Sequence, residues 1–362
     1  MCAVEWKCLD EIAIVSIGEF VHKDKQNPNA EYPVYNGGIS NTGYYEDFNN
    51  TGNKIIISAR GANAGYINRV FVNYWAGNSC YSISVTSNDV DWNFLFYYLK
   101  TNQQKLIGEQ QKGGIPAISK KQICTFKIPI PSLAKQQEIV SHLDTFTTLI
   151  SNLESELDMR RKQYEHYRNQ LLDFEGVEGV DFKLLKSICN VINGRAYKQS
   201  ELLSEGKYKV LRVGNFFSND SWYFSDLELE DKYYCLEGDL LYAWSASFGP
   251  HIWQEDKTIY HYHIWKMDCN EMILKKYMYY WLQSDNMKKQ AFASLHGATM
   301  AHLTKVLMEN LEVPIPSIKT QQEIVEKLDD FENLIQSLEQ EIKLRKQQYE
   351  YYREKLLTFE KE

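Results

Sequence analysis

The residues from Ile128 to Glu175 recur, without a gap, as Val313 to Glu360. About 27 of the 48 aligned positions are identical, and the shared stretches include PIPS, QQEIV and an LLxFE ending. The two copies start 185 positions apart, far beyond the period of about 20–50 residues that is typical of solenoid repeats. The repeat therefore predicts two large units of one plan, each a globular segment followed by a long helix.

Each copy also carries a heptad pattern, in which core residues recur at alternating steps of four and three. Arg160 and Arg345 occupy core positions, where a polar residue usually fixes the register at some cost in stability. Ser132 and Ser317 follow Pro-x-Pro and are expected to cap the helix starts. The pattern predicts that the two helices pack on each other as a coiled coil. The expected core positions are Ile139, Leu143, Phe146, Ile150, Leu153, Leu157 and Arg160, and in the second copy Ile324, Leu328, Phe331, Ile335, Leu338, Ile342 and Arg345.

The remaining sequence is aromatic, divided by glycines, and rich in short alternating runs that favour strands. We expect an α+β fold, in which two globular domains, each a small twisted sheet plus helices, alternate with two long helices that pair as an antiparallel coiled coil with pseudo-two-fold symmetry. The expected boundaries are 1–127 for the first domain, 128–175 for the central helix, 176–312 for the second domain and 313–362 for the C-terminal helix. Strands are expected at 32–35, 54–58, 208–211 and 239–244, and helices at 92–104 and 271–293.

The two globular segments are similar in sequence only at their ends. We therefore expect the two domains to share one structural framework but to differ in their interior residues. Val4 to Leu9 is similar to Val180 to Leu185, whereas the interiors share little. The second helix ends where the start of the first domain could follow, which predicts termini that lie close together.

Composition restricts the class of protein. The formal net charge of −8 argues against a protein that neutralises DNA phosphates on its own, so any nucleic-acid role requires basic partners. The seven cysteines include no C-x-x-C pair, which favours reduced thiols. The N-terminus has no secretory signal and no apolar run reaches the length of a membrane span, so a cytoplasmic location is expected.

Catalytic motifs are absent from the sequence. There is no Gly-rich loop for nucleotide phosphates, no dinucleotide fingerprint and no Asn/Asp-Pro-Pro-aromatic tetrapeptide. Glu230-Asp231-Lys232 suits a charged surface turn better than a nuclease centre. His261 and His263 would share one face of a strand over 259–265, where a packed or hydrogen-bonding pair is favoured over a metal site. The sequence predicts no catalytic residues, no metal site and no enzyme activity of its own.

The doubled pattern PIPS…QQEIV…YxxYRxxLLxFE at domain spacing resembles the specificity subunit of Type I restriction-modification systems, over essentially the whole chain. The resemblance implies that each globular domain reads one half of a split DNA target. It also implies that the antiparallel helices set the spacing and dock two methyltransferase subunits, through which restriction subunits join. No cofactor is then expected in this chain, and S-adenosylmethionine, ATP and Mg²⁺ are expected in the partner subunits.

Candidate DNA contacts are polar or cationic residues in Gly-rich loops that follow strand-like runs, because base edges are read by Arg, Asn, Ser and Thr. A plain turn is the alternative for Asn36-Gly37-Gly38, and Trp244 is favoured as a core residue. The first-domain candidates are Asn36, Gly37, Gly38, Ser40, Asn41, Arg60, Asn63 and Lys112. The second-domain candidates are Arg195, Tyr197, Lys198, Arg212, Asn215, Ser245, Ser247, His296 and Thr299.

Helix length gives a limit on the target. A helix over 139–174 would measure roughly 54 Å, and half-sites one turn apart on DNA leave a spacer of roughly 5–8 base pairs. Gln136, Gln137, Gln321 and Gln322 are duplicated residues at the helix starts and are candidates for two equivalent docking sites. Two other interpretations stay open at this point: a non-catalytic coiled-coil scaffold, and a fragment of a fused methyltransferase-nuclease.

Overall fold

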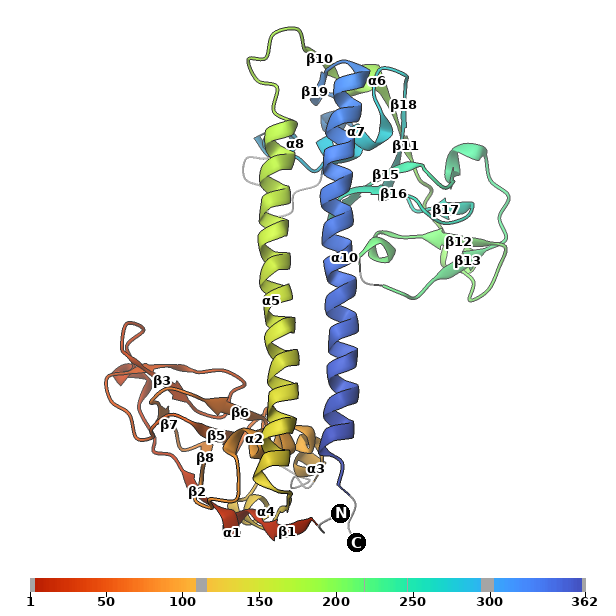
Figure 1. Ribbon diagram of the computed structural model, residues 1–362. Coiled ribbons are helices and arrows are strands. Elements are labelled where there is room, and N and C mark those ends of the chain that lie inside the picture. Colours follow the sequence, from red (N-terminus) through yellow and green to blue (C-terminus); the bar gives the residue numbers. More distant parts are fainter. Residues whose placement is uncertain (1–3, 109–115, 218, 246, 294–302, 360–362) are drawn as a thin grey trace. The chain divides into compact units, whose positions relative to one another are not determined.

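The computed structural model describes residues 4–108, 116–217, 219–245, 247–293 and 303–359. The chain divides into two compact units: residues 1–154 with 340–362 form unit 1, and residues 155–339 form unit 2. Each unit contains one globular segment, part of helix α5 (Leu133–Leu171) and part of helix α10 (Ile318–Leu357) (Figure 1). The protein is therefore a mixed helix-and-sheet protein built in two units.

Unit 1 holds two sheets and a separate two-stranded ribbon, where the sequence predicted one small sheet. Its four-stranded sheet has the order β2-β8-β5-β6 and is antiparallel, whereas β3 and β7 pair in parallel within the order β4-β3-β7. The ribbon joins β1 to β9. The strands are β1 (Glu5–Cys8), β2 (Ala13–Ile17), β3 (Tyr32–Tyr35), β4 (Gly43–Tyr45), β5 (Lys54–Ser58), β6 (Ile67–Val70), β7 (Trp75–Ala76), β8 (Cys80–Val85) and β9 (Lys127–Ile130). The short helices are α1 (Leu9–Ile12), α2 (Trp92–Thr101), α3 (Gln103–Gly108) and α4 (Lys120–Cys124), with a 3-10 turn at Lys23–Lys25.

Unit 2 repeats this plan, with one additional strand in its second sheet. A ribbon joins β10 to β19, the antiparallel sheet has the order β11-β18-β15-β16, and the second sheet, β13-β12-β17-β14, again contains one parallel pair, β12 with β17. The strands are β10 (Asp181–Leu184), β11 (Cys189–Asn193), β12 (Tyr208–Leu211), β13 (Tyr223–Ser225), β14 (Tyr234–Cys235), β15 (Leu240–Ser245), β16 (Ser247–Ile252), β17 (Thr258–Tyr260), β18 (Ile264–Cys269) and β19 (Glu312–Ile315). The helices are α6 (Leu185–Ile188), α7 (Lys275–Trp281), α8 (Asp285–Ala293) and α9 (Lys305–Glu309), with 3-10 turns at Gln199–Glu201, Val213–Phe216 and Asp231–Tyr233. The common frame thus extends through both interiors, although their sequences diverge.

The two helices predicted within the globular segments are each divided in two. The first breaks at Asn102, whose side-chain amide donates to the Tyr98 carbonyl 2.9 Å away and ends α2. The second breaks before α8, where the Ser284 hydroxyl accepts from the Met287 N–H at 3.2 Å. In both places a short polar side chain competes for backbone hydrogen bonds and so ends or restarts the helix.

The long helices contribute to the hydrophobic core of each unit. In unit 1, Ile139 and Leu143 of α5 and Leu357 of α10 are buried in the same cluster as Phe94 of α2. Trp6 and Phe359, close to the two ends of the described chain, pack against this same cluster. In unit 2 the equivalent cluster includes Tyr164 of α5 and Leu172 just after its end, Ile324 and Leu328 of α10, and Trp281 of α7. Each globular segment is therefore one folding unit with its own part of the helices.

The helix caps follow the prediction. The Ser132 hydroxyl accepts from the Lys135 N–H at 3.4 Å, and the Ser317 hydroxyl accepts from the Thr320 N–H at 3.1 Å. No helix in the described part of the chain combines the length and the apolar composition that a membrane crossing requires.

Every predicted heptad core position is buried or half-buried. Arg160 and Arg345 depart from the expected role, because each pairs along its own helix. Arg160 pairs with Glu156 at 3.2 Å, and Arg345 pairs with Glu341 at 2.7 Å. Their side chains are 39% and 37% exposed, so neither is a buried polar core residue.

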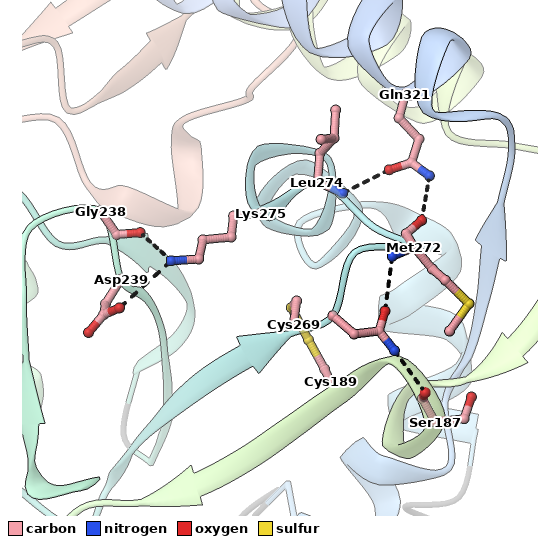
Figure 2. The surroundings of a disulfide bond; sticks show 10 residues. Ser187, Cys189, Gly238, Asp239, Cys269, Met272, Leu274, Lys275 and Gln321 are labelled. Atoms are coloured by element: carbon pink, nitrogen blue, oxygen red, sulfur yellow. Dashed lines mark hydrogen bonds and ion pairs between the residues drawn. A yellow bond between two sulfur atoms is a disulfide. The ribbon is translucent and has the colours of Figure 1, made fainter. Parts of the chain in front are cut away.

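Gln136 and Gln321 are not docking residues on the surface, because both side chains are fully buried. The Gln321 amide oxygen accepts from the Leu274 N–H at 2.9 Å, and its nitrogen donates to the Met272 carbonyl at 3.0 Å (Figure 2). The same nitrogen donates to the Pro316 carbonyl at 3.0 Å. Gln136 makes the same three bonds in unit 1, to Asp89, Pro131 and Asp91, each at 2.8 Å. Each glutamine fastens a long-helix start to a globular segment, whereas Gln137 and Gln322 are exposed.

The expectation of reduced thiols is wrong for one pair of cysteines. Cys189 on β11 and Cys269 on β18 form a disulfide, with Cα atoms 4.0 Å apart (Figure 2). They are direct partners in the antiparallel register, and the equivalent partners in unit 1 are Ala13 and Val85. Separation by 80 positions hides this pairing from sequence inspection, because only the sheet register brings the two residues together. The other cysteines of the described chain, Cys8, Cys80, Cys124 and Cys235, are free.

Candidate nucleic-acid interface

Two of the predicted loops in unit 1 lie against each other. The Ser58 hydroxyl, at the end of β5, donates to the Gly38 carbonyl at 2.9 Å. Gly37 has a φ of +77°, and an added Cβ would lie 3.1 Å from the Arg60 carbonyl, so the close approach requires glycine. The structure thus brings loop 36–41 and turn 60–63 together.

The residues of these loops divide into supports and exposed groups. The Asn36 side-chain oxygen accepts from the Ser79 N–H at 3.0 Å, which holds loop 36–41 in place. Ser40, Arg60 and Asn63 are exposed, whereas Asn41 is half-buried near the Gly43 carbonyl. Of these candidates, only the exposed three present their side chains to the surroundings of the unit. Lys112 lies outside the described residues.

In unit 2, Arg195 is engaged in an internal ion pair. Its two terminal nitrogens donate to the two Glu201 carboxylate oxygens at 3.0 and 2.8 Å, and its guanidinium lies 5.1 Å from the centre of the Tyr197 ring. The Arg195 hydrogen bonds, with one from the Lys198 N–H, lower the pKa of Glu201 to about 2. Arg195 could bind an external group only after releasing Glu201. The Lys198 side chain, in contrast, is exposed.

Arg212 of unit 2 is more exposed than Arg195. It is exposed at the end of β12, and its guanidinium lies 5.3 Å from the centre of the Tyr223 ring. Asn215 is a loop support, because its oxygen accepts from the Arg212 N–H at 3.1 Å and its nitrogen donates to the carbonyls of Asn219 and Ser221. The amide of Asn215 therefore positions Arg212.

His261 and His263 lie in a turn between β17 and β18, so the single strand expected over 259–265 is wrong. Their ring centres are 4.9 Å apart. Burial, with the nearby His263 and Arg212 charges, lowers the pKa of His261 to about 4, so His261 is neutral at pH 7. Gly194 approaches this turn so closely that an added Cβ would lie 2.4 Å from the His261 carbonyl oxygen.

The remaining candidates surround the β15–β16 hairpin. Ser245 is half-buried at the end of β15 and is the register partner of Ser247. Trp244 is half-buried, donates its ring N–H to the Tyr262 carbonyl at 2.9 Å and packs on the unit 2 core, as a core residue should. His296 and Thr299 lie outside the described residues.

Glu201 and Tyr223 were missed by sequence reasoning. Glu201 follows Lys198 by three positions, a spacing typical of a side chain that returns to a helix start, and this signal could have indicated its bond to the Lys198 N–H. Tyr223 has no such signal, because only the sheet places it beside Arg212. The Glu230-Asp231-Lys232 segment forms an exposed turn in which Lys232 pairs with Glu230 at 2.8 Å. Within the described ranges, no group of three or more His, Cys, Asp or Glu side chains could hold a metal ion.

Each unit thus carries loops with exposed polar or cationic side chains, Arg60 and Asn63 in unit 1 and Lys198 and Arg212 in unit 2. The Type I restriction modification DNA specificity domain family matches residues 3–159 and 177–344, and the chain belongs to this family. It is 29% identical to a putative type I restriction enzyme specificity subunit of Haemophilus influenzae, over 98% of this chain and 96% of that protein. It is 31% identical to the EcoR124I/EcoR124II specificity subunit of Escherichia coli, over 77% of this chain and 73% of that protein.

Two solved structures share the fold. The S subunit of a Type I restriction-modification system from M. genitalium matches with a TM-score of 0.67 and 19% identity, over 100% of this chain and 98% of that chain. A chain from a study of type I restriction-modification complex assembly matches with a TM-score of 0.65 and 15% identity, over 99% of this chain and 98% of that chain. As a member of this family the protein is a DNA-recognition subunit and is itself non-catalytic, since catalysis in these systems resides in other subunits.

Proposed function

We propose that each globular domain reads one half of a bipartite DNA target, that α5 and α10 pair as an antiparallel coiled coil that fixes the spacer, and that this pair docks two methyltransferase subunits. Restriction subunits would join through the methyltransferases. The domains would be 1–127 and 176–312, connected by the helical segments 128–175 and 313–362. The observation that carries the proposal is that the two units share the same arrangement of sheets and helices but differ in their loops. Such a pair of domains suits two different half-sites.

Antiparallel pairing is supported by contacts inside each unit. In unit 1, Phe146 stacks on Tyr352, and Glu154 pairs with Lys346 at 2.6 Å. The later residue of α5 thus contacts the earlier residue of α10, as in antiparallel helices. In unit 2, Arg161 pairs with Glu339 at 2.6 Å and Tyr167 stacks on Phe331, in the same sense. These pairs suit a pseudo-two-fold axis that relates the two copies.

The reading residues would be Arg60 with Asn63 in unit 1 and Arg212 in unit 2. Arginine recognises guanine and asparagine recognises adenine through paired hydrogen bonds in the major groove. Arg60 and Asn63 are exposed on one turn, and Arg212 is exposed beside an aromatic ring. The acidic chain would depend on the methyltransferases for most phosphate neutralisation.

A repeated apolar surface on the long helices suits two identical partners. In unit 2, Tyr167, Phe331 and Leu334 line a groove of about 890 Å³. The exposed fractions of Tyr167 and Leu334 are 38% and 40%, and those of their repeat equivalents, Tyr352 and Leu149, are 36% and 37%. Exposed apolar residues that recur at equivalent positions favour one docking site per unit for the same protein surface.

The test is co-expression with a type I methyltransferase subunit from the same organism, followed by mapping of methylated bases on plasmid DNA. We expect a split motif with a fixed spacer that disappears when this chain is omitted. Methylation that is independent of this chain, or a continuous motif, would contradict the proposal.

A further inference from the structure

A cavity of about 390 Å³ in unit 2 is lined by Arg168 of α5 and by residues of the globular segment. Arg168 is only 7% exposed, and its Nε, like that of its repeat equivalent Arg353, has no hydrogen-bond partner among the described residues. The other cations on this part of α5 are neutralised: Arg161 pairs with Glu339 and Lys162 pairs with Asp158. No carboxylate of the described chain lies within ion-pair distance of Arg168.

The repeat shows what neutralises the equivalent residue in unit 1. Arg353 pairs with Glu350 three positions earlier on α10. Glu165 occupies the same place before Arg168, and it lines the cavity without forming the pair. A buried guanidinium without a counter-ion is costly, so the unit 2 cavity is suited to an anion supplied from outside the chain.

The walls of the cavity connect it to the predicted DNA-reading loops. Phe217 directly follows the 3-10 turn Val213–Phe216, which begins after Arg212, and Phe248 lies on β16, the second strand of the hairpin whose first strand ends at Ser245. Helix α8, which also lines the cavity, is held beside the end of α5 by a 2.8 Å bond from Asn169 to Asp285 (Figure 1). The cavity thus adjoins the proposed half-site surface.

We propose that this cavity binds a backbone phosphate of the second DNA half-site, with Arg168 as the residue that pairs with it. This inference rests on the proposed function and assigns a phosphate contact to the long helix itself. Arginine matches phosphate geometry through two parallel hydrogen bonds. Phosphate contacts position the duplex without reading its sequence, so such a contact suits an arginine of the long helix, outside the divergent loops.

The experiment uses the assembled complex of this chain with its methyltransferase and a duplex that carries the mapped target. Substitution Arg168→Gln is expected to weaken binding about tenfold at moderate salt and to reduce the slope of log affinity against log salt by about one. Lys162→Gln removes an exposed, paired charge from the same helix and should change neither quantity. Arg353→Gln tests the equivalent residue that already has a partner, and it should leave the slope unchanged.

A series of duplexes, each with one neutral methylphosphonate, identifies the phosphate. One position beside the second half-site should weaken the wild-type complex about tenfold and should not weaken the Arg168→Gln complex further. Glu165→Gln, an exposed change that is safe for folding, should tighten binding severalfold because it removes a competing negative charge.

Other outcomes overturn the inference. Specific binding that is indifferent to Arg168 and to Glu165 would leave the proposed function standing and remove the phosphate site. Loss of methyltransferase assembly in Arg168→Gln would show that the cavity holds an acidic side chain of the partner protein instead. A complex with no split target at all would contradict the proposed function itself.

Discussion

Phe146 stacks on Tyr352 with ring centres 5.5 Å apart and ring planes at 21°, and their repeat equivalents, Phe331 and Tyr167, stack at 5.4 Å and 25°. The same correspondence holds for a half-buried hydrogen bond between a tyrosine hydroxyl and an aspartate of a long helix. Asp144 accepts from the Tyr97 hydroxyl at 2.5 Å, and Asp329 accepts from the Tyr280 hydroxyl at 2.5 Å. The repeated sequence therefore specifies side-chain geometry as well as helix formation.

The buried glutamines give the first test of this shared frame. Gln136→Ala removes a side chain with three hydrogen bonds and leaves two backbone carbonyls and one N–H without their partner. We expect the free energy of unfolding to fall by about 2–4 kcal/mol, measured by urea denaturation. Gln137→Ala, the exposed neighbour, should stay within about 0.5 kcal/mol of wild type. Equal effects of the two changes would show that Gln136 does not fasten the helix.

Several elements follow from local sequence alone. Strands β3, β5 and β12 occupy the expected ranges because β-branched and aromatic residues alternate there between turn signals. The long helices and their serine caps follow from the heptads and the Pro-x-Pro steps. These features depend on neighbours in sequence, which a single chain displays.

The features that sequence could not reveal depend on residues far apart in the chain. The burial of Gln321 depends on Met272 and Leu274, 49 and 47 positions away. Likewise, the disulfide between Cys189 and Cys269 depends on the sheet register, across a separation of 80 positions. The sequence does not show whether a polar residue supports a loop or contacts a ligand. Only the folded structure shows that Asn215 supports its loop and that Arg212 is exposed.

Arginines in the two units should affect different halves of the target. Arg60→Gln is expected to relax sequence preference in one half-site only, and Arg212→Gln in the other only, each at a cost of about 1–3 kcal/mol in binding. The measurement is methylation mapping of each variant complex against a library of randomised targets. If one substitution altered both half-sites, the assignment of one domain to one half-site would be wrong.

The Arg195–Glu201 pair predicts a pH effect on stability. Because the pKa of Glu201 is lowered from 4.5 to about 2 in the folded chain, the pair stabilises fully above about pH 4.5 and this contribution is lost as pH falls toward 2. Glu201→Gln should therefore lower the thermal midpoint at pH 7, and the difference from wild type should shrink as the pH falls below 4.5. A difference that is constant from pH 7 to pH 3, measured by circular dichroism, would exclude this ion pair as its source.

If each unit binds one methyltransferase subunit through its apolar surface, substitutions in that surface should remove the bound subunits one at a time. Leu334→Asp places a charge in the unit 2 groove and should reduce the complex from two methyltransferase subunits to one. Leu149→Asp should have the same effect through unit 1, and the double variant should bind none. Native mass spectrometry measures the stoichiometry. Asn152→Asp, an exposed position on α5 outside this surface, is the matched control and should retain both subunits.

The proposal that the length of the helix pair sets the spacer between the half-sites can be tested by shortening both helices without changing their register. Deletion of one heptad from each helix, residues 151–157 and 336–342, removes equivalent positions of the repeat and keeps the heptad phase. Seven residues correspond to roughly 10.5 Å of helix, or about three base pairs of DNA. We expect methylation mapping to report the same two half-sites with a spacer about three base pairs shorter. A deletion in only one helix breaks the pairing and should abolish methylation, whereas altered half-site sequences in the matched deletion would show that the helices do more than set distance.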